Sequence, residues 1–123
     1  DYTGGEQADN DYVIFRYADV LLMKAEALLR TNQEAEARTI VNELRAARGA
    51  SALTTLDEQT LLDERGRELY WEGWRRQDLI RFGKYLTPWQ EKPTDDPKYL
   101  LFPIPTEQLA VNPNLEQNPG YAD

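Results

Sequence analysis

Cysteine and histidine are both absent from the 123 residues of this sequence. Their absence excludes disulfides, thiol nucleophiles, Cys/His zinc sites, Ser-His-Asp triads and imidazole general bases. Any catalysis would depend on carboxylates, and we expect neither a metal nor an organic cofactor. The sequence also lacks an apolar run near the roughly 18 residues that a membrane-spanning helix requires. It begins with an acidic segment instead of a basic leader, so we expect a mature product or a fragment.

Basic residues are too few to balance the acidic ones. The chain has 14 Lys and Arg residues and 22 Asp and Glu residues, which gives a net charge of -8 and a pI near 4.6. Binding to a phosphate backbone needs a basic surface, so this balance argues against nucleic acid as a partner.

Charge and proline content divide the chain into three parts. Residues 1–14 form an acidic lead-in with four acids and no base. Residues 15–84 hold twelve acids and twelve bases, which is typical of helices with many ion pairs. All seven prolines follow residue 87, so we predict loop and an extended strap over 85–123. We expect a single all-α domain over 1–123, with about four helices.

The first two predicted helices form a hairpin. The stretch 15–30 carries an apolar stripe with helical spacing, made of Ala18, Leu21, Leu22, Ala25, Leu28 and Leu29. Residues 31–34 have the Ser/Thr-x-x-Glu form of a capping box, which predicts that a second helix begins there. That helix ends near Gly49 and has one apolar face, made of Ala37, Ile40, Val41 and Leu44. The pair is about as long as one tetratricopeptide unit.

Two further helices are predicted between residues 55 and 84. Residues 55–58 are a second capping-box candidate, and apolar residues keep helical spacing to about Gly73. Gly66 and Gly73 lie on the inner stripe of this helix, so we expect another backbone to pack closely against it. A short helix over 74–84 follows.

Charged side chains crowd these helices, and arginine is more frequent than lysine among them. Planar guanidinium groups suit paired hydrogen bonds to carboxylates at the edge of a core. We therefore predict a structural ion-pair network, made of Arg16, Asp19, Glu64, Glu68, Glu72, Arg75, Asp78 and Arg81. The alternative is a carboxylate active site, but nearby arginines lower carboxyl pKa values where a catalytic pair needs one raised. A di-metal centre is rejected because that design uses Glu-x-x-His.

Three motifs occur in order along the chain. The stretch 64–84 reads ERGRELYWEGWRRQDLIRFGK, and the stretch 16–27 reads RYADVLLMKAEA. The tail contains PIP at 103–105, NP at 112–113 and QNPGY at 117–121. In order and spacing these motifs resemble those of the SusD/RagB family, and the resemblance extends from about residue 12 to residue 121.

The resemblance implies a mostly helical fold of tetratricopeptide-like hairpins and a binding function, not an enzyme. SusD-like proteins bind glycans or other nutrients and deliver them to a TonB-dependent SusC-like porin. They are lipid-anchored on the external face of the outer membrane of Bacteroidetes. The resemblance implies that this chain is the C-terminal portion of such a protein, with the lipid-bearing cysteine outside it. Family ligand sites are formed largely upstream of this portion.

A sugar-binding platform needs an exposed flat ring, and the best candidates lie in the acidic, Pro-rich region. Trp89 is the first, with Tyr85 and Tyr99 near it in sequence. Trp71 and Trp74 lie inside the helical signature, so we expect them to pack in the core.

The tail over 103–121 is predicted to be a strap over the helices, in preference to a recognition peptide. Its expected apolar anchors are Ile104, Leu109, Val111, Leu115 and Tyr121. Two other functions remain open for the chain: a helical interaction scaffold with no glycan site of its own, and a carboxylate-based glycosidase.

Overall fold

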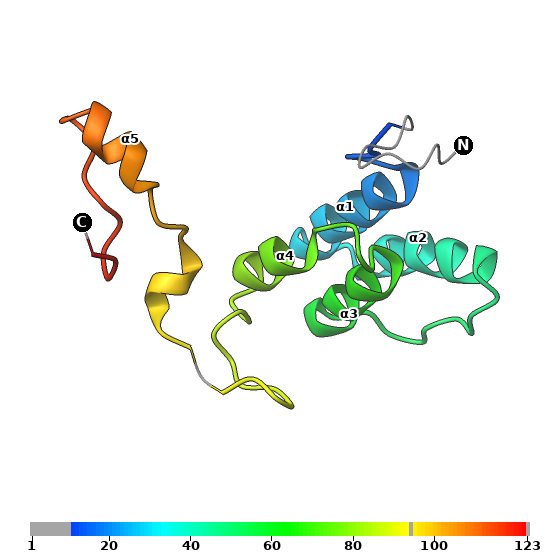
Figure 1. Cartoon of the computed structure of the whole chain (residues 1–123). Coiled ribbons are helices and arrows are strands. Elements are labelled where there is room, and N and C mark those ends of the chain that lie inside the picture. Colours follow the sequence, from blue (N-terminus) through cyan, green and yellow to red (C-terminus); the bar gives the residue numbers. More distant parts are fainter. Residues whose placement is uncertain (1–10, 94, 123) are drawn as a thin grey trace. The chain divides into compact units, whose positions relative to one another are not determined.

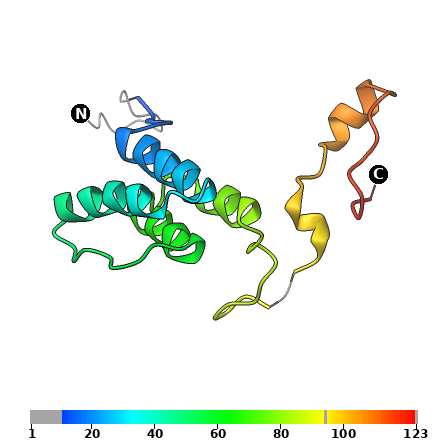
Figure 2. The same ribbon diagram turned by 180° about the vertical axis from the view of Figure 1, so that it is seen from behind.

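Helices make up the regular structure in the computed structural model, which describes residues 11–93 and 95–122. Figure 1 and Figure 2 show the elements from two sides: α1 (Tyr17–Arg30), α2 (Glu34–Ala47), α3 (Glu58–Glu68), α4 (Arg75–Arg81), the 3-10 helix η1 (Pro97–Leu100) and α5 (Thr106–Val111). Within these residues no β-strand forms, and an isolated antiparallel bridge joins Trp89 to Lys92. The predicted all-α class is confirmed. Most of the acidic lead-in over 1–14 lies outside the described residues.

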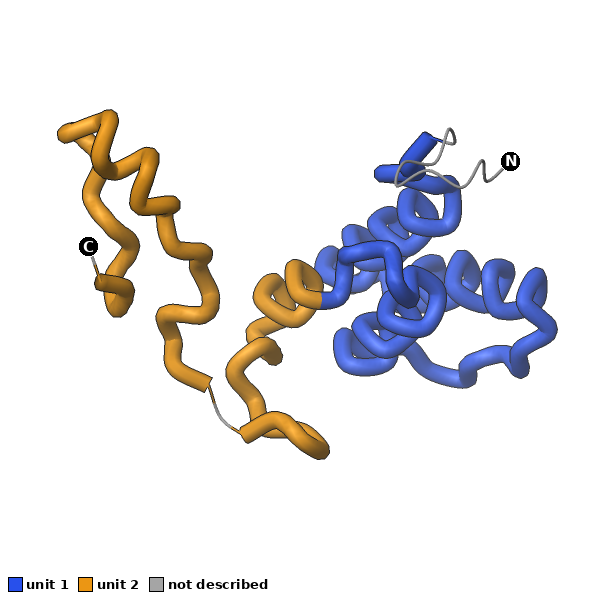
Figure 3. Tube along the Cα trace, viewed as in Figure 1, with its two compact units in different colours: residues 1–75 blue, residues 76–123 orange. Residues whose placement is uncertain are grey.

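The chain divides into two compact units, residues 1–75 and 76–123, which Figure 3 colours blue and orange. The predicted helical body extended to residue 84, so the division falls inside it, at the start of α4. The single domain over 1–123 stays a prediction. The two units are described separately below.

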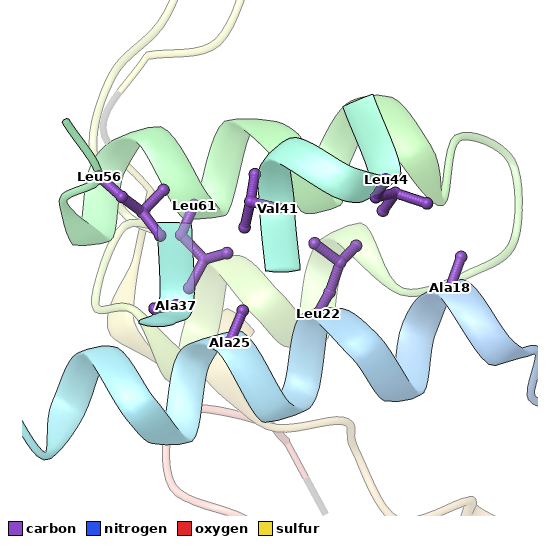
Figure 4. Packing of buried hydrophobic residues seen from close by; sticks show 8 residues of the cluster. All are labelled: Ala18, Leu22, Ala25, Ala37, Val41, Leu44, Leu56 and Leu61. Atoms are coloured by element: carbon purple, nitrogen blue, oxygen red, sulfur yellow. The ribbon is translucent and has the colours of Figure 1, made fainter. Parts of the chain in front are cut away.

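The core of the first unit is the contact between α1, α2 and α3. α1 packs against α2 and also against α3, and Figure 4 shows their apolar side chains converging. The cluster consists of Ala18, Leu22 and Ala25 from α1, Ala37, Val41 and Leu44 from α2, and Leu56 and Leu61 from the third helix and the segment before it. Burial of a leucine-sized side chain stabilises a fold by about 1.5–3 kcal/mol. The apolar stripes therefore lie where their spacing predicted, and Leu61 adds a core position outside them.

The capping box predicted at residues 31–34 is wrong. Asn32 adopts a left-handed backbone with φ 62, which closes α1 instead of opening α2. The Thr31 hydroxyl donates backward to the carbonyl oxygens of Ala27 and Leu28. The Glu34 carboxylate accepts from the backbone N–H of Leu56 at 2.8 Å, so it ties α2 to the segment before α3.

The capping box predicted at residues 55–58 is also wrong, by two positions. Asp57 is the N-cap of α3, and its carboxylate accepts a hydrogen bond from the Thr60 backbone N–H at 2.7 Å. This bond lowers the pKa of Asp57 below its ordinary value. An aspartate satisfies an orphan amide at a helix start as well as a threonine does.

α3 ends at Glu68, earlier than the predicted end near Gly73. Trp71 and Gly73 both have positive φ, at 65 and 82, so the backbone turns between α3 and α4. The predicted short helix over 74–84 forms as α4, over Arg75–Arg81 only.

The close approach predicted at Gly66 involves a side chain instead of a backbone. A Cβ atom at this position would lie 2.7 Å from Nη1 of Arg75. The same Nη1 donates to the Leu62 carbonyl oxygen at 2.8 Å. Because Gly66 has no Cβ atom, the Arg75 guanidinium can pack against α3 at this position.

The tail of the second unit folds on itself through side-chain to backbone hydrogen bonds. The Gln117 amide bonds both the N–H and the carbonyl of Ile104, at 2.8 and 2.9 Å. The Asn118 amide donates to the Phe102 carbonyl at 2.7 Å, and the Tyr121 hydroxyl donates to the Leu101 carbonyl at 2.9 Å. These contacts hold the QNPGY motif against the PIP segment.

Three of the five expected tail anchors are half-buried, namely Ile104, Leu109 and Tyr121. Val111 and Leu115 are exposed, and their role as anchors on the helices stays a prediction. Helix α5 was not expected, because the proline-rich pattern predicted extended chain. The packing of the tail over the helices stays a prediction.

Candidate functional site

Charged residues of the first unit pair in three groups that include members of the predicted network. Asp19 of α1 and Arg65 of α3 lie deepest, with side-chain exposures of 0% and 3%. Asp19 Oδ1 and Arg65 Nη2 are 3.0 Å apart. Two opposite charges removed from water at this distance stabilise each other and cross-link the two helices.

A second group surrounds Arg16, which precedes α1. Its Nη1 lies 2.6 Å from Glu68 Oε1, and its Nε lies 2.7 Å from Glu72 Oε2. Arg48 donates to the same Glu68 carboxylate from the end of α2, at 2.8 Å. These bonds lower the pKa of Glu68, with the hydrogen bond from Arg48 as the largest cause. They raise the pKa of Arg16, chiefly through Glu72, and of Arg48 through Glu68.

The third group surrounds Glu64, one turn before Glu68 on α3. The Glu64 carboxylate accepts hydrogen bonds from Arg45 of α2 and from Arg67 on its own helix. Arg45 also donates to the Ser51 carbonyl at 2.7 Å, which ties down the connection after α2.

Apart from Glu72, the second and third groups line one groove, with a volume of about 490 Å³. Its charged lining is four arginines and two glutamates, and each of these glutamates accepts from at least two of the arginines. A glycosidase proton donor needs a raised pKa, whereas the pKa of Glu68 is lowered. The groove therefore suits a structural role better than acid catalysis.

The remaining predicted network members lie apart from these groups. Arg75 is 3.8 Å from the Asp63 carboxylate. Asp78 of α4 is buried and pairs with Arg81 at 2.7 Å. The predicted residues thus form several groups, and four of their arginine partners were missing from the predicted set: Arg45, Arg48, Arg65 and Arg67. The signal for Arg65 was available, because it lies beside Glu64 in the signature.

The candidate ligand-binding aromatics all lie in the second unit. Trp89 is the most open of the three at 57% exposed, Tyr99 is 43% exposed and Tyr85 is half-buried. Trp89 opens a tight turn in which its backbone bonds Lys92 in both directions, at 3.0 and 2.7 Å. Lys92 Nζ lies 5.5 Å from the centre of the Tyr85 ring and donates to the Tyr85 carbonyl at 2.8 Å. The turn that presents Trp89 is therefore fixed to Tyr85.

Arg76 contacts three aromatic residues of this unit. Its guanidinium lies 4.0 Å from the centre of the Phe102 ring and 5.2 Å from the centre of the Tyr85 ring. Its Nη2 also donates to the Tyr99 carbonyl at 2.7 Å. Phe102 was not among the predicted residues, although it is exposed and precedes the PIP motif. One planar cation thus contacts three aromatic residues, through the rings of Phe102 and Tyr85 and the carbonyl of Tyr99.

The two tryptophans expected in the core behave differently. Trp74 is half-buried and packs on Phe15, with ring centroids 5.5 Å apart. Trp71 is 89% exposed, so the prediction for it is wrong in this chain. The helical pattern that placed it inward ends at Glu68, and the turn that follows directs it outward.

Within the described residues, no group of three or more carboxylates is placed to hold a metal ion. No helix in that part of the chain is long and apolar enough to cross a membrane.

The SusD family model matches residues 1–97 of the sequence. The chain belongs to the SusD family. This confirms the resemblance carried by the motifs in 16–27 and 64–84.

Curated SusD-family relatives match this chain over most of its length. It is 40% identical to the starch-binding protein SusD of Bacteroides thetaiotaomicron, over 92% of this chain and 22% of that protein. It is 36% identical to the SusD-like protein P38 of Formosa agariphila, over 92% of this chain and 25% of that protein. The chain thus spans about a quarter of the length of these relatives.

Solved structures of SusD-like and glycan-binding proteins share the fold. The surface glycan-binding protein A of Bacteroides uniformis superposes with a TM-score of 0.78 at 32% identity, over 89% of this chain and 28% of that one. A SusD-like protein of Bacteroides fragilis gives a TM-score of 0.73 at 27% identity, over 89% of this chain and 26% of that one. The predicted tetratricopeptide-like helical fold is therefore confirmed for this member of the SusD family.

Proposed function

We propose that this chain is the C-terminal portion of a cell-surface protein that binds a glycan or another nutrient. The observation that carries the proposal is the 40% identity, over 92% of this chain, to a protein named for starch binding. The likeness to a surface glycan-binding protein supports the same ligand class. The whole protein delivers its ligand to a TonB-dependent SusC-like transporter, as the family resemblance implies.

The proposed location is the external face of the outer membrane. The protein is held there by a lipidated cysteine outside this chain, so the chain itself needs no membrane contact. A net charge of -8 is consistent with a surface that binds neither nucleic acid nor anionic lipid.

Within this chain, the proposed ligand-binding residues are Trp89, Tyr85 and Tyr99. Trp89 contributes the stacking face, because its ring is open and its turn is held by Lys92. Tyr85 and Tyr99 lie in the same unit, where Arg76 contacts the Tyr85 ring and the Tyr99 carbonyl. A rigid flat ring with neighbouring polar groups suits the apolar face of a pyranose.

A second candidate function is a helical scaffold without a glycan site of its own. Two observations favour it: the chain covers about a quarter of its relatives, and its charged groove is occupied by its own ion pairs. In this case the ligand site lies in the rest of the family fold.

Binding without bond cleavage fits both candidates. The relatives compared above are named as binding or SusD-like proteins. A carboxylate glycosidase is disfavoured because arginines bind the glutamates of the groove and lower the pKa of Glu68.

The test is isothermal titration of the 123-residue chain against starch, other plant and host polysaccharides, and their oligomers. Trp89→Ala is the test variant, and Trp71→Ala is the matched control, because Trp71 is also an exposed tryptophan. Saturable binding that falls at least tenfold in Trp89→Ala and holds in Trp71→Ala supports a site in this chain. No binding by a chain whose circular dichroism is helical supports the scaffold. Release of reducing sugar would contradict both.

A further inference from the structure

An apolar surface lies at one end of the first unit. It is made of residues 12–15, Tyr17, Val20, Tyr70 and Trp71, and we call it the terminal apolar patch. Each of these side chains is exposed by half or more, from 50% at Val20 to 89% at Trp71. So many exposed large apolar side chains are uncommon at one place on an isolated soluble domain, and they mark an interaction site.

Two segments far apart in sequence meet to form the patch. The Phe15 and Trp74 rings are 5.5 Å apart, and Arg16 pairs with Glu72 at 2.7 Å. The Tyr12 hydroxyl lies 3.9 Å from where a Cβ on Gly73 would be. Residues 12–16 therefore run beside residues 72–74, and the exposed rings of Tyr70 and Trp71 adjoin them in the chain.

Helix α1 is apolar on two faces, which distinguishes it from α2. Its inner face packs in the core, while Tyr17 and Val20 remain exposed. α2 has no exposed large hydrophobic side chain. An amphipathic helix needs one buried face, so a helix that is apolar on two faces belongs between two layers.

The backbone conformation of Trp71 also indicates that this surface is covered by another layer. This residue has φ 65, in the left-handed region, which costs a bulky residue of order 1–3 kcal/mol. Such strain persists where surrounding structure over-determines it. Burial of the Trp71 ring against another layer would supply that stabilisation.

We infer that the terminal apolar patch is the surface on which the rest of the SusD-family fold packs. The solved relatives share this chain's fold over only 26% and 28% of their own length. About three quarters of such a fold is thus available as the partner. Tetratricopeptide-like units bury their second face on a stacked neighbour. Such a neighbour would cover the apolar side chains of the patch.

A glycan fits this surface less well. Val13, Ile14 and Val20 have neither a flat ring nor a polar group for a sugar hydroxyl, and they make up much of the patch. The inference rests on family membership and is independent of the glycan site proposed at Trp89.

The test compares each substitution in two contexts. The first is the 123-residue chain. The second is a chimera in which this chain replaces the homologous segment of the surface glycan-binding protein A of Bacteroides uniformis. Val20→Glu places a charge in the patch, and Ala46→Glu, at an exposed position of α2, is the matched control. Trp71→Gly removes the ring and at the same time relieves the left-handed strain.

We expect Val20→Glu to leave the melting temperature of the isolated chain within about 2 °C, and Trp71→Gly to leave it unchanged or higher. In the chimera both should lower the melting temperature by about 5 °C or more, or abolish soluble expression. Ala46→Glu should be neutral in both contexts. The opposite response of Trp71→Gly in the two contexts is the decisive result.

Three results would overturn the inference. Equal effects in chain and chimera would place the patch within the chain's own fold. A dimer of the isolated chain in sedimentation that Val20→Glu dissociates, with no effect in the chimera, would make a second copy the occupant. An unfolded parent chimera beside a folded isolated chain would show that the surface does not fit a SusD-family fold. Because folding is the readout, none of these results bears on glycan binding.

Discussion

Asp19 of α1 and Arg65 of α3 are paired at 3.0 Å with almost no contact with water. Asp19 also lies in the first turn of its helix, where the positive end of the helix dipole favours a carboxylate. The pair fixes how α1 and α3 approach each other, and both residues lie within the family motifs. Replacing only one of the two residues leaves the other as an unpaired buried charge, which strongly destabilises the fold.

Asp19→Ala is therefore expected to lower the free energy of unfolding by about 3–5 kcal/mol. The double variant Asp19→Leu with Arg65→Met should recover much of this loss, because neither charge then remains buried. Urea unfolding followed by circular dichroism measures both. Glu58→Gln is the control, because the Arg30–Glu58 pair is exposed and 3.4 Å long, and it should change stability by less than about 1 kcal/mol. An equally small effect of Asp19→Ala would show that the buried pair contributes nothing.

Glu68 gives the fold an acid-sensitive contact. Hydrogen bonds from Arg48 and Arg16 lower its pKa below the ordinary value of 4.5. The unfolded chain therefore takes up this proton first, so the contribution is complete above about pH 4.5 and is lost as pH falls through the folded pKa. Arg16 and Arg48 keep their charge throughout, because their own pKa values are raised.

Glu68→Gln should flatten the dependence of unfolding free energy on pH between about pH 5 and pH 3. Some dependence should persist, because the pKa of Asp57 is also lowered. Urea titrations of both proteins across this range provide the measurement. Parallel curves for the parent and Glu68→Gln would contradict the assignment of this acid sensitivity to Glu68.

Asp57 is expected to stabilise α3 as its N-cap. Asp57→Ala removes the acceptor for the Thr60 N–H, now 2.7 Å away, and should destabilise the chain by about 0.5–2 kcal/mol. Asp57→Ser keeps a capping oxygen and should cost far less. Thr55→Ala tests the capping box that the sequence predicted, and it should be nearly neutral. A larger effect at Thr55 than at Asp57 in thermal unfolding would reverse the assignment.

Sequence periodicity predicted the parts of the fold that depend on apolar spacing. The stripes of α1 and α2 pack as expected, since Leu22, Ala25, Ala37 and Val41 are buried at helical intervals. The crowding of charged residues predicted an ion-pair network that includes Glu64 and Glu68 of α3 and Arg16 before α1. These features are local, or repeat along one helix, so a single sequence carries them.

The remaining features depend on contacts between segments. Trp71 followed a helical pattern, but two left-handed residues break that pattern after Glu68 and leave the ring exposed. Arg45 and Arg48 could be assigned to Glu64 and Glu68 only once α2 and α3 were placed together. Trp89 stays a predicted ligand residue, because an exposed ring is accessible to a sugar but does not by itself indicate binding.

The effect of Gly66→Ala on stability should change sign according to whether Arg75 is present. In an exposed helix, Gly→Ala stabilises by up to about 1 kcal/mol. Here the new methyl would lie 2.7 Å from Arg75 Nη1 and displace the guanidinium that bonds the Leu62 carbonyl. Gly66→Ala alone should thus be neutral or destabilising by about 1 kcal/mol, because the lost hydrogen bond offsets the gain in helix propensity.

In the Arg75→Ala background, the same Gly66→Ala change should stabilise the chain by about 1 kcal/mol, because the side chain that it would displace is gone. Thermal or urea unfolding of the four proteins gives the coupling energy directly. Arg75→Ala alone should cost about 1 kcal/mol, for the hydrogen bond to Leu62. Its 40% exposed side chain leaves no buried acid behind, since its carboxylate neighbour Asp63 is 42% exposed. Additive effects of the two substitutions would show that the guanidinium does not occupy the place left by the missing Cβ.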